Sequence, residues 1–115
     1  MTVINVRSVI AVADLDAALA WYERLFGRPA DSLPMDGLAE WHLTGSGGIQ
    51  LVRDADHAGK SVTTLIVDDL EKQVADLVSR DLDGGAITTG DVARFAVISD
   101  PEGNTITFAE PIGES

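Results

Sequence analysis

The sequence Val-Ala-Asp-Leu at residues 12–15 returns 55 residues later as Val-Asp-Asp-Leu at 67–70. In each copy a run rich in β-branched residues comes first, as a buried strand requires, and an Asp follows where it can cap a helix. Further along, Ile-x-Leu at 49–51 returns as Ile-x-Phe at 106–108, an offset two residues longer than that of the first pair. Two copies in 115 residues are too few for a solenoid and indicate two modules of one domain.

Each module is predicted to contain a strand, a helix and a group of antiparallel strands. Apolar side chains at Leu15, Ala18, Leu19, Tyr22 and Phe26 share one helical face, and Gly27 ends that helix. The elements expected in the first module are a strand at 3–12, the helix, a short strand near Ala30–Leu33 and a hairpin of Leu38–Thr44 and Ile49–Arg53. Those expected in the second are strands at 61–67, 86–89, 94–99 and 105–109 and a helix after Asp69.

The fold class predicted from this order is α+β, with two tandem βαβββ modules in a single domain over residues 1–115. Module one covers about 1–56 and module two about 57–115. Because each helix can cover only one face of its strands, the strands are expected to form a cupped mixed sheet with the helices on its outer face.

Composition excludes several classes of function. The 8 Lys and Arg stand against 19 Asp and Glu, and the net charge of −11 argues against nucleic acid and anionic membrane surfaces as partners. Without cysteine the chain can form neither disulfides nor thiolate metal sites. No apolar run approaches the roughly 18 residues of a membrane span and no signal peptide is visible, so a cytoplasmic protein is expected.

Three motifs in order resemble those of the vicinal oxygen chelate superfamily, which includes glyoxalase I, bleomycin resistance proteins and extradiol dioxygenases. They are Val-x-Asp-Leu-Asp at 12–16 with Trp-Tyr-x-x-x-Phe-Gly at 21–27, Val-Asp-Asp-Leu-Glu at 67–71, and Asp-Pro-Glu-Gly-Asn-Thr-Ile-Thr-Phe-x-Glu-Pro at 100–111. The resemblance covers nearly the whole chain. It implies the glyoxalase/bleomycin resistance-like fold, with a divalent metal held inside the cup in the family's enzymes.

The resemblance also places the metal ligands, and this chain departs from the pattern there. The expected His, Gln or Glu ligands fall at positions that are here Arg7, Gln50, Val62 and Thr107. An Arg has no lone pair to donate and a Val has no donor atom at all. Neither metal nor cofactor is therefore expected.

The resemblance implies that Arg7, at the position of a metal ligand, points into the cup. Strand alternation then adds Gln50, Val62, Thr64 and Thr107 to that surface. Arg7 offers a guanidinium to a carboxylate or phosphate, which makes it the expected anion-recognising group. The alternative for Arg7 is an internal salt bridge to one of the many acids, and for Gln50 and Thr107 a hydrogen bond within the protein.

Trp41 and His42 are neighbours on one predicted strand, so their side chains point to opposite faces. Trp41 could stack on a ligand ring and His42 could act as an acid or base near neutral pH. The sequence leaves open which of the two residues faces the cup.

The function predicted from these residues is metal-independent binding or sequestration of a small organic molecule, aromatic or anionic, as in the bleomycin resistance branch. The alternative is a glyoxalase-type lyase, isomerase or dioxygenase that uses a displaced metal or His42 as acid–base group. Because members of the superfamily commonly pair and a small chain gains from extra burial, a homodimer is also expected.

Overall fold

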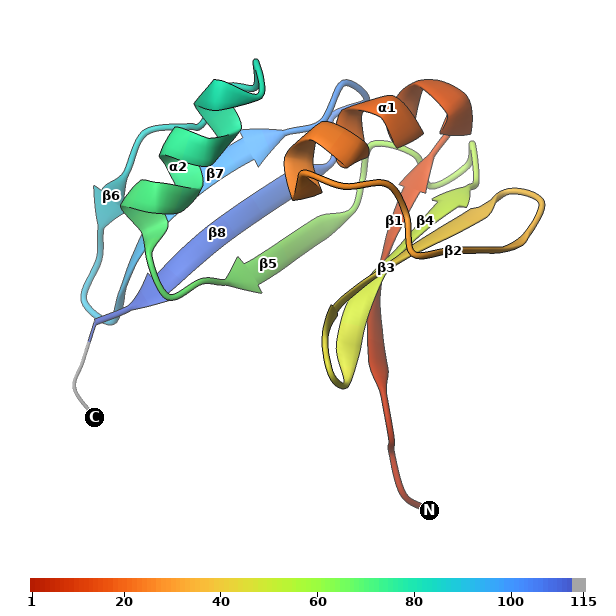
Figure 1. The fold of residues 1–115 in the computed structure, drawn as a ribbon, viewed down its shortest axis with the longest axis horizontal. Coiled ribbons are helices and arrows are strands. Elements are labelled where there is room, and N and C mark those ends of the chain that lie inside the picture. The colour runs from red at the N-terminus through yellow and green to blue at the C-terminus, as the bar shows by residue number, and fades with distance from the viewer. Residues whose placement is uncertain (113–115) are drawn as a thin grey trace.

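The computed structural model describes residues 1–112, which fold as two βαβββ modules (Figure 1). Module one comprises β1 (Val6–Val12), α1 (Leu15–Phe26), β2 (Ser32–Met35), β3 (Leu38–Thr44) and β4 (Gly47–Arg53). Module two comprises β5 (Val62–Ile66), α2 (Leu70–Ser79), β6 (Thr88–Thr89), β7 (Ala93–Ser99) and β8 (Thr105–Pro111). No helix in this part of the chain is long and apolar enough to cross a membrane.

The strands form two four-stranded mixed sheets, which confirms the α+β fold class. The first sheet has the order β1-β4-β3-β2 and the second β5-β8-β7-β6, so each module repeats one topology. In both sheets the first strand of the module pairs in parallel with the last strand of that module, β1 with β4 and β5 with β8. The register is equivalent too, since Val9 lies opposite Gln50 and Thr64 lies opposite Thr107.

Both helices begin at the capping residues that the repeat predicts. The side chain of Asp14 accepts a hydrogen bond from the backbone N–H of Ala17, and that of Asp69 accepts one from Lys72, each at 3.1 Å. Gly27 ends α1 with a φ of 73°, a left-handed conformation that glycine adopts without strain.

Two strands are shorter than expected because fewer of their residues pair with a neighbouring strand. The strand predicted from residue 3 begins at Val6, whose N–H bonds to the carbonyl of Ser46 in the β3–β4 turn, so β4 supplies no partner before it. Similarly, β6 is confined to Thr88–Thr89, the only two of the four expected residues that pair with β7.

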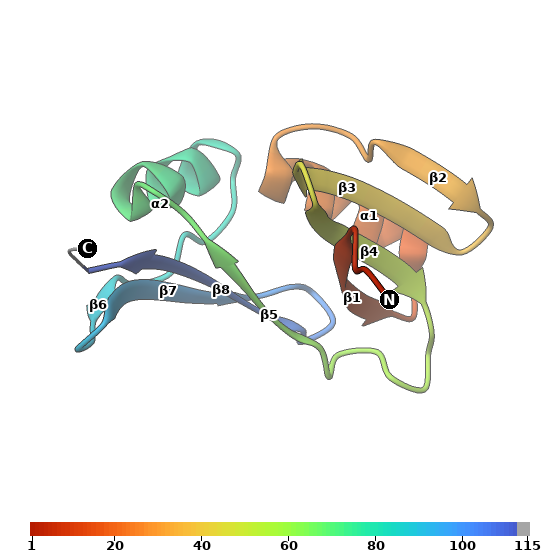
Figure 2. The ribbon, with the colours of Figure 1, turned by 90° about the horizontal axis from the view of Figure 1, so that it is seen from below.

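The core joins the two modules. Alternate residues of every long strand pack against the helices, and the buried side chains of both modules form one continuous hydrophobic cluster. Figure 2 shows that each helix lies against its own sheet, leaving the opposite face of that sheet uncovered. We call these uncovered surfaces the helix-free faces of the first and second sheets.

The loop Asp100–Asn104 links the modules through buried polar groups. The Asn104 amide donates to the carbonyl of Ala11 in β1 at 2.9 Å and to the Asp100 carboxylate at 2.8 Å. That carboxylate also accepts the hydroxyl of Tyr22 from α1 at 2.7 Å. Burial, followed by this bond and the negative charge of Asp100, raises the pKa of Tyr22 above its ordinary value. The loop therefore connects module two to module one in addition to joining β7 and β8.

Candidate functional site

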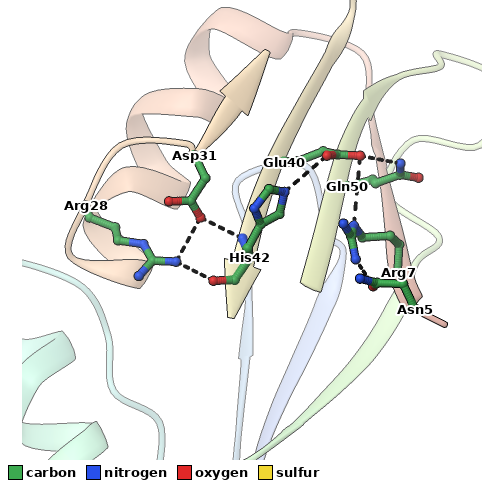
Figure 3. Close-up of polar contacts among 7 residues, drawn as sticks. All are labelled: Asn5, Arg7, Arg28, Asp31, Glu40, His42 and Gln50. Carbon is green, nitrogen blue, oxygen red and sulfur yellow. Dashed lines mark hydrogen bonds and ion pairs between the residues drawn. The ribbon is translucent and has the colours of Figure 1, made fainter. Parts of the chain in front are cut away.

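Polar side chains gather on the helix-free face of the first sheet. Asn5 and Arg7 come from the N-terminal segment and β1, Glu40 and His42 from β3, and Gln50 from β4 (Figure 3). Strand alternation brings them together because the residues between them, such as Trp41 and Ile49, point into the core. We call these five residues the polar cluster.

Glu40 lies at the centre of the polar cluster. One carboxylate oxygen accepts a hydrogen bond from the Gln50 amide at 2.7 Å, and the second lies 3.3 Å from Nε2 of His42. The Arg7 Nε lies 3.9 Å from the oxygen bound to Gln50. The guanidinium of Arg7 also donates to the side chain of Asn5.

The electrostatics of the polar cluster follow from these contacts. The hydrogen bonds from Gln50 and His42, with the positive charge of Arg7, lower the pKa of Glu40, so its carboxylate is ionised at neutral pH. Arg7 and Glu40 compensate each other's charge, although Arg7 Nε is buried without a hydrogen-bond partner in the described residues.

A second ion pair supports the strand that carries His42. Asp31 accepts the backbone N–H of His42 at 2.6 Å, while Arg28 donates to Asp31 at 2.9 Å and to the carbonyl of His42 at 2.6 Å (Figure 3). The bond from His42, opposed by partial desolvation and aided by Arg28, lowers the pKa of Asp31. These contacts hold the backbone of His42 near the end of β3 and so fix the position from which its side chain extends.

The structure brings together three of the residues predicted from the sequence and separates the others. Arg7, His42 and Gln50 lie in the polar cluster, whereas Val62, Thr64 and Thr107 lie on the second sheet, on its helix-free face. Val62 and Thr64 are exposed and Thr107 is half-buried.

Trp41 requires a correction. Its side chain is fully buried against Tyr22 and Phe26, with ring centroids 6.3 and 5.4 Å away, and its indole N–H donates to the carbonyl of Arg28 at 3.0 Å. A ring packed on these neighbours offers no surface to a ligand. Of the two adjacent residues, His42 is therefore the one on the helix-free face.

Glu40 is the residue that sequence reasoning missed. The signal was present, because a buried Trp41 puts both of its neighbours on the opposite face of β3. The expectation of an internal acid beside Arg7 did not name this residue, since Arg7 and Glu40 meet only through β4, which lies between their strands.

The residues at the expected ligand positions do not fit a metal ion. Equivalent registers in the two sheets place Arg7 and Val62 in corresponding sites, and likewise Gln50 and Thr107. This set provides one cation, one side chain without donor atoms, one amide and one hydroxyl. Across residues 1–112, moreover, no three His, Asp or Glu side chains come close enough to hold a metal.

Comparison with known proteins identifies the family. The model of the glyoxalase-like domain matches residues 7–109. A glyoxalase/bleomycin resistance protein from Catenulispora acidiphila DSM 44928 has 32% identity and a TM-score of 0.86, covering 93% of this chain and 97% of that one. No curated protein matches the chain in sequence.

More distant solved structures share the fold. TnmS3, an antibiotic binding protein from Streptomyces sp. CB03234, has 21% identity and a TM-score of 0.76 over 97% of this chain and 98% of its own. A glyoxalase/bleomycin resistance protein from the same organism has 23% identity and a TM-score of 0.72 over 91% and 98%. With two equivalent βαβββ modules and a family match across nearly its full length, the chain belongs to the glyoxalase-like domain family of the vicinal oxygen chelate superfamily.

Proposed function

We propose that this protein binds a small organic molecule on the helix-free faces of its sheets without the help of a metal ion. The observation that carries the proposal is the set of side chains at the superfamily's ligand positions, which offer hydrogen bonds and apolar contact but no metal site. Arg7, His42 and Gln50 supply polar contacts from the first sheet, and Val62, Thr64 and Thr107 supply apolar and hydroxyl contacts from the second.

Two further features support a binding role. The exposed strand residues of the second sheet include Val62, Ile66 and Val97, which suit an apolar ligand body. The likeness to TnmS3, which binds an antibiotic, agrees with a ligand of this kind.

A thermal-shift experiment on metal-free protein tests the proposal. Protein treated with EDTA is screened against aromatic carboxylates, amides and amines and against bleomycin. A ligand at ten times its Kd stabilises the folded state by about 1.4 kcal/mol, which raises Tm by about 5 °C in a domain of this size. We expect such a shift, unchanged by EDTA, and reduced in Gln50→Ala but not in the matched variant Gln73→Ala on α2.

The main alternative is a glyoxalase-type lyase, isomerase or dioxygenase. The observation in its favour is the 3.3 Å contact between His42 and the Glu40 carboxylate, an arrangement that can orient an imidazole for proton transfer. Stoichiometric Zn, Ni, Mn or Fe in the purified protein, together with ligand shifts abolished by EDTA, would contradict the binding proposal and favour this alternative.

We also propose that the chain forms a homodimer. Large apolar side chains are exposed on β1 and on the segment before it, among them Ile4 at 83%, Val6 at 65% and Val9 at 52%. Burying such a surface against a second copy would stabilise a small domain. Light scattering during size-exclusion chromatography should therefore give about twice the 12.2 kDa of one chain at micromolar concentration. A mass of one chain throughout that range would exclude the dimer.

A further inference from the structure

Among the strand residues that the structure describes, the charged side chains on the helix-free faces belong to the polar cluster. In the second sheet the residues that share a face with Thr64 and Thr107 are apolar or carry hydroxyl groups, as the register Val97–Thr107 and Phe95–Ala109 shows. The charge that a ligand meets on the described strands is therefore set by Arg7 and Glu40.

Within the cluster, Glu40 already occupies the place that an acidic ligand would take. Its carboxylate is held by the Gln50 amide at 2.7 Å and lies 3.9 Å from Arg7 Nε. The side chains of Arg7 and Glu40 are only 25% and 14% exposed, so water screens their interaction incompletely. A ligand carboxylate that approached Arg7 would be repelled by Glu40.

We infer that Glu40 is a specificity-determining residue that makes this site select neutral polar ligands and reject anions. The inference rests on the proposed function and names its ligand class: an apolar body that carries a neutral amide or hydroxyl group. Gln50 and His42 offer such a group hydrogen bonds, and a neutral group does not disturb the pairing of Arg7 with Glu40. Arg7 is therefore expected to recognise an anion only in a variant that lacks Glu40.

The test compares benzamide with benzoate, two probes of nearly equal shape that differ in charge. Wild-type protein should bind benzamide about tenfold more tightly than benzoate, since like charges in a partly desolvated site are strongly unfavourable. Glu40→Gln keeps an oxygen for the Gln50 amide and removes the charge. This variant should bind benzoate about tenfold more tightly than wild type does and so lose the preference for benzamide. Calorimetry or ligand-detected NMR measures the four dissociation constants.

Two variants separate this effect from a change in overall charge. Asp36→Asn removes one charge from a carboxylate that is 94% exposed, and it should leave both dissociation constants within about twofold of wild type. The double variant Arg7→Met with Glu40→Gln should lose the gain in benzoate affinity, because that gain requires the guanidinium.

Equal binding of the two probes by wild type, or an unchanged preference in Glu40→Gln, overturns the inference and leaves metal-independent binding intact. Failure of both probes to bind wild type and Glu40→Gln also overturns it. If the larger thermal-shift panel then shows no ligand either, the proposed function fails as well. Circular dichroism of each variant establishes that the fold is unchanged.

Discussion

Replacing Asn104 with alanine should lower the free energy of unfolding by about 3 kcal/mol. Asn104 is fully buried, and its amide oxygen accepts the N–H of Ser61 at 2.9 Å while its amide nitrogen donates to the carbonyl of Ala11 at 2.9 Å. Alanine would leave both backbone groups without partners and open a small void between the modules. The hydrogen bonds lost are those that join β1 to the residue before β5.

Denaturant unfolding and thermal melting measure this loss. A decrease of about 3 kcal/mol corresponds to a fall in Tm of roughly 10 °C for a domain of this length. Asn5→Ala is the matched control, because Asn5 is exposed and its truncation should change stability by less than about 0.5 kcal/mol. An Asn104→Ala variant as stable as this control would show that the loop does not clamp the modules.

The repeat explains why so much of the fold could be predicted. Capping Asp residues and β-branched runs act locally, so Asp14 and Asp69 mark helix starts that the structure reproduces. Strand lengths were less accurate because pairing is not local. Val6 begins β1 only because β4 starts at Gly47, which residues 3–12 alone do not reveal.

The site could be predicted only in part for the same reason. Alternation within each strand places Arg7 of β1 and Gln50 of β4 on the helix-free face, and the structure agrees. It does not say which acid faces Arg7, because that depends on the order β1-β4-β3 and on the register between strands. The contacts of the loop Asp100–Asn104 could not be predicted from the sequence, since its partners Ala11 and Tyr22 lie about ninety and eighty residues away along the chain.

Gly48 marks the place where the polar cluster depends on a close approach of two backbones. A Cβ built on this residue would lie 2.3 Å from the carbonyl oxygen of Trp41 and 3.4 Å from Cα of His42. The first distance is far inside van der Waals contact, and the obstructing atom belongs to the backbone, so no side-chain rotation relieves it. Glycine at 48 thus allows β3 and β4 to pair just before the irregularity between His42 and Thr44.

Gly48→Ala should therefore lower the free energy of unfolding by about 2–3 kcal/mol and weaken benzamide binding by displacing His42. Gly45→Ala, in the turn that precedes β4, is the matched control, because nothing lies within 4 Å of its Cβ position and its φ is not in the left-handed region. This control should be neutral or slightly stabilising, since alanine restricts the unfolded chain. Urea unfolding of both variants measures the loss of stability, and NMR of the His42 ring reports whether that side chain is displaced. Equal stabilities and unchanged His42 signals would mean that β3 and β4 can separate without cost, and the close approach would then not position the polar cluster.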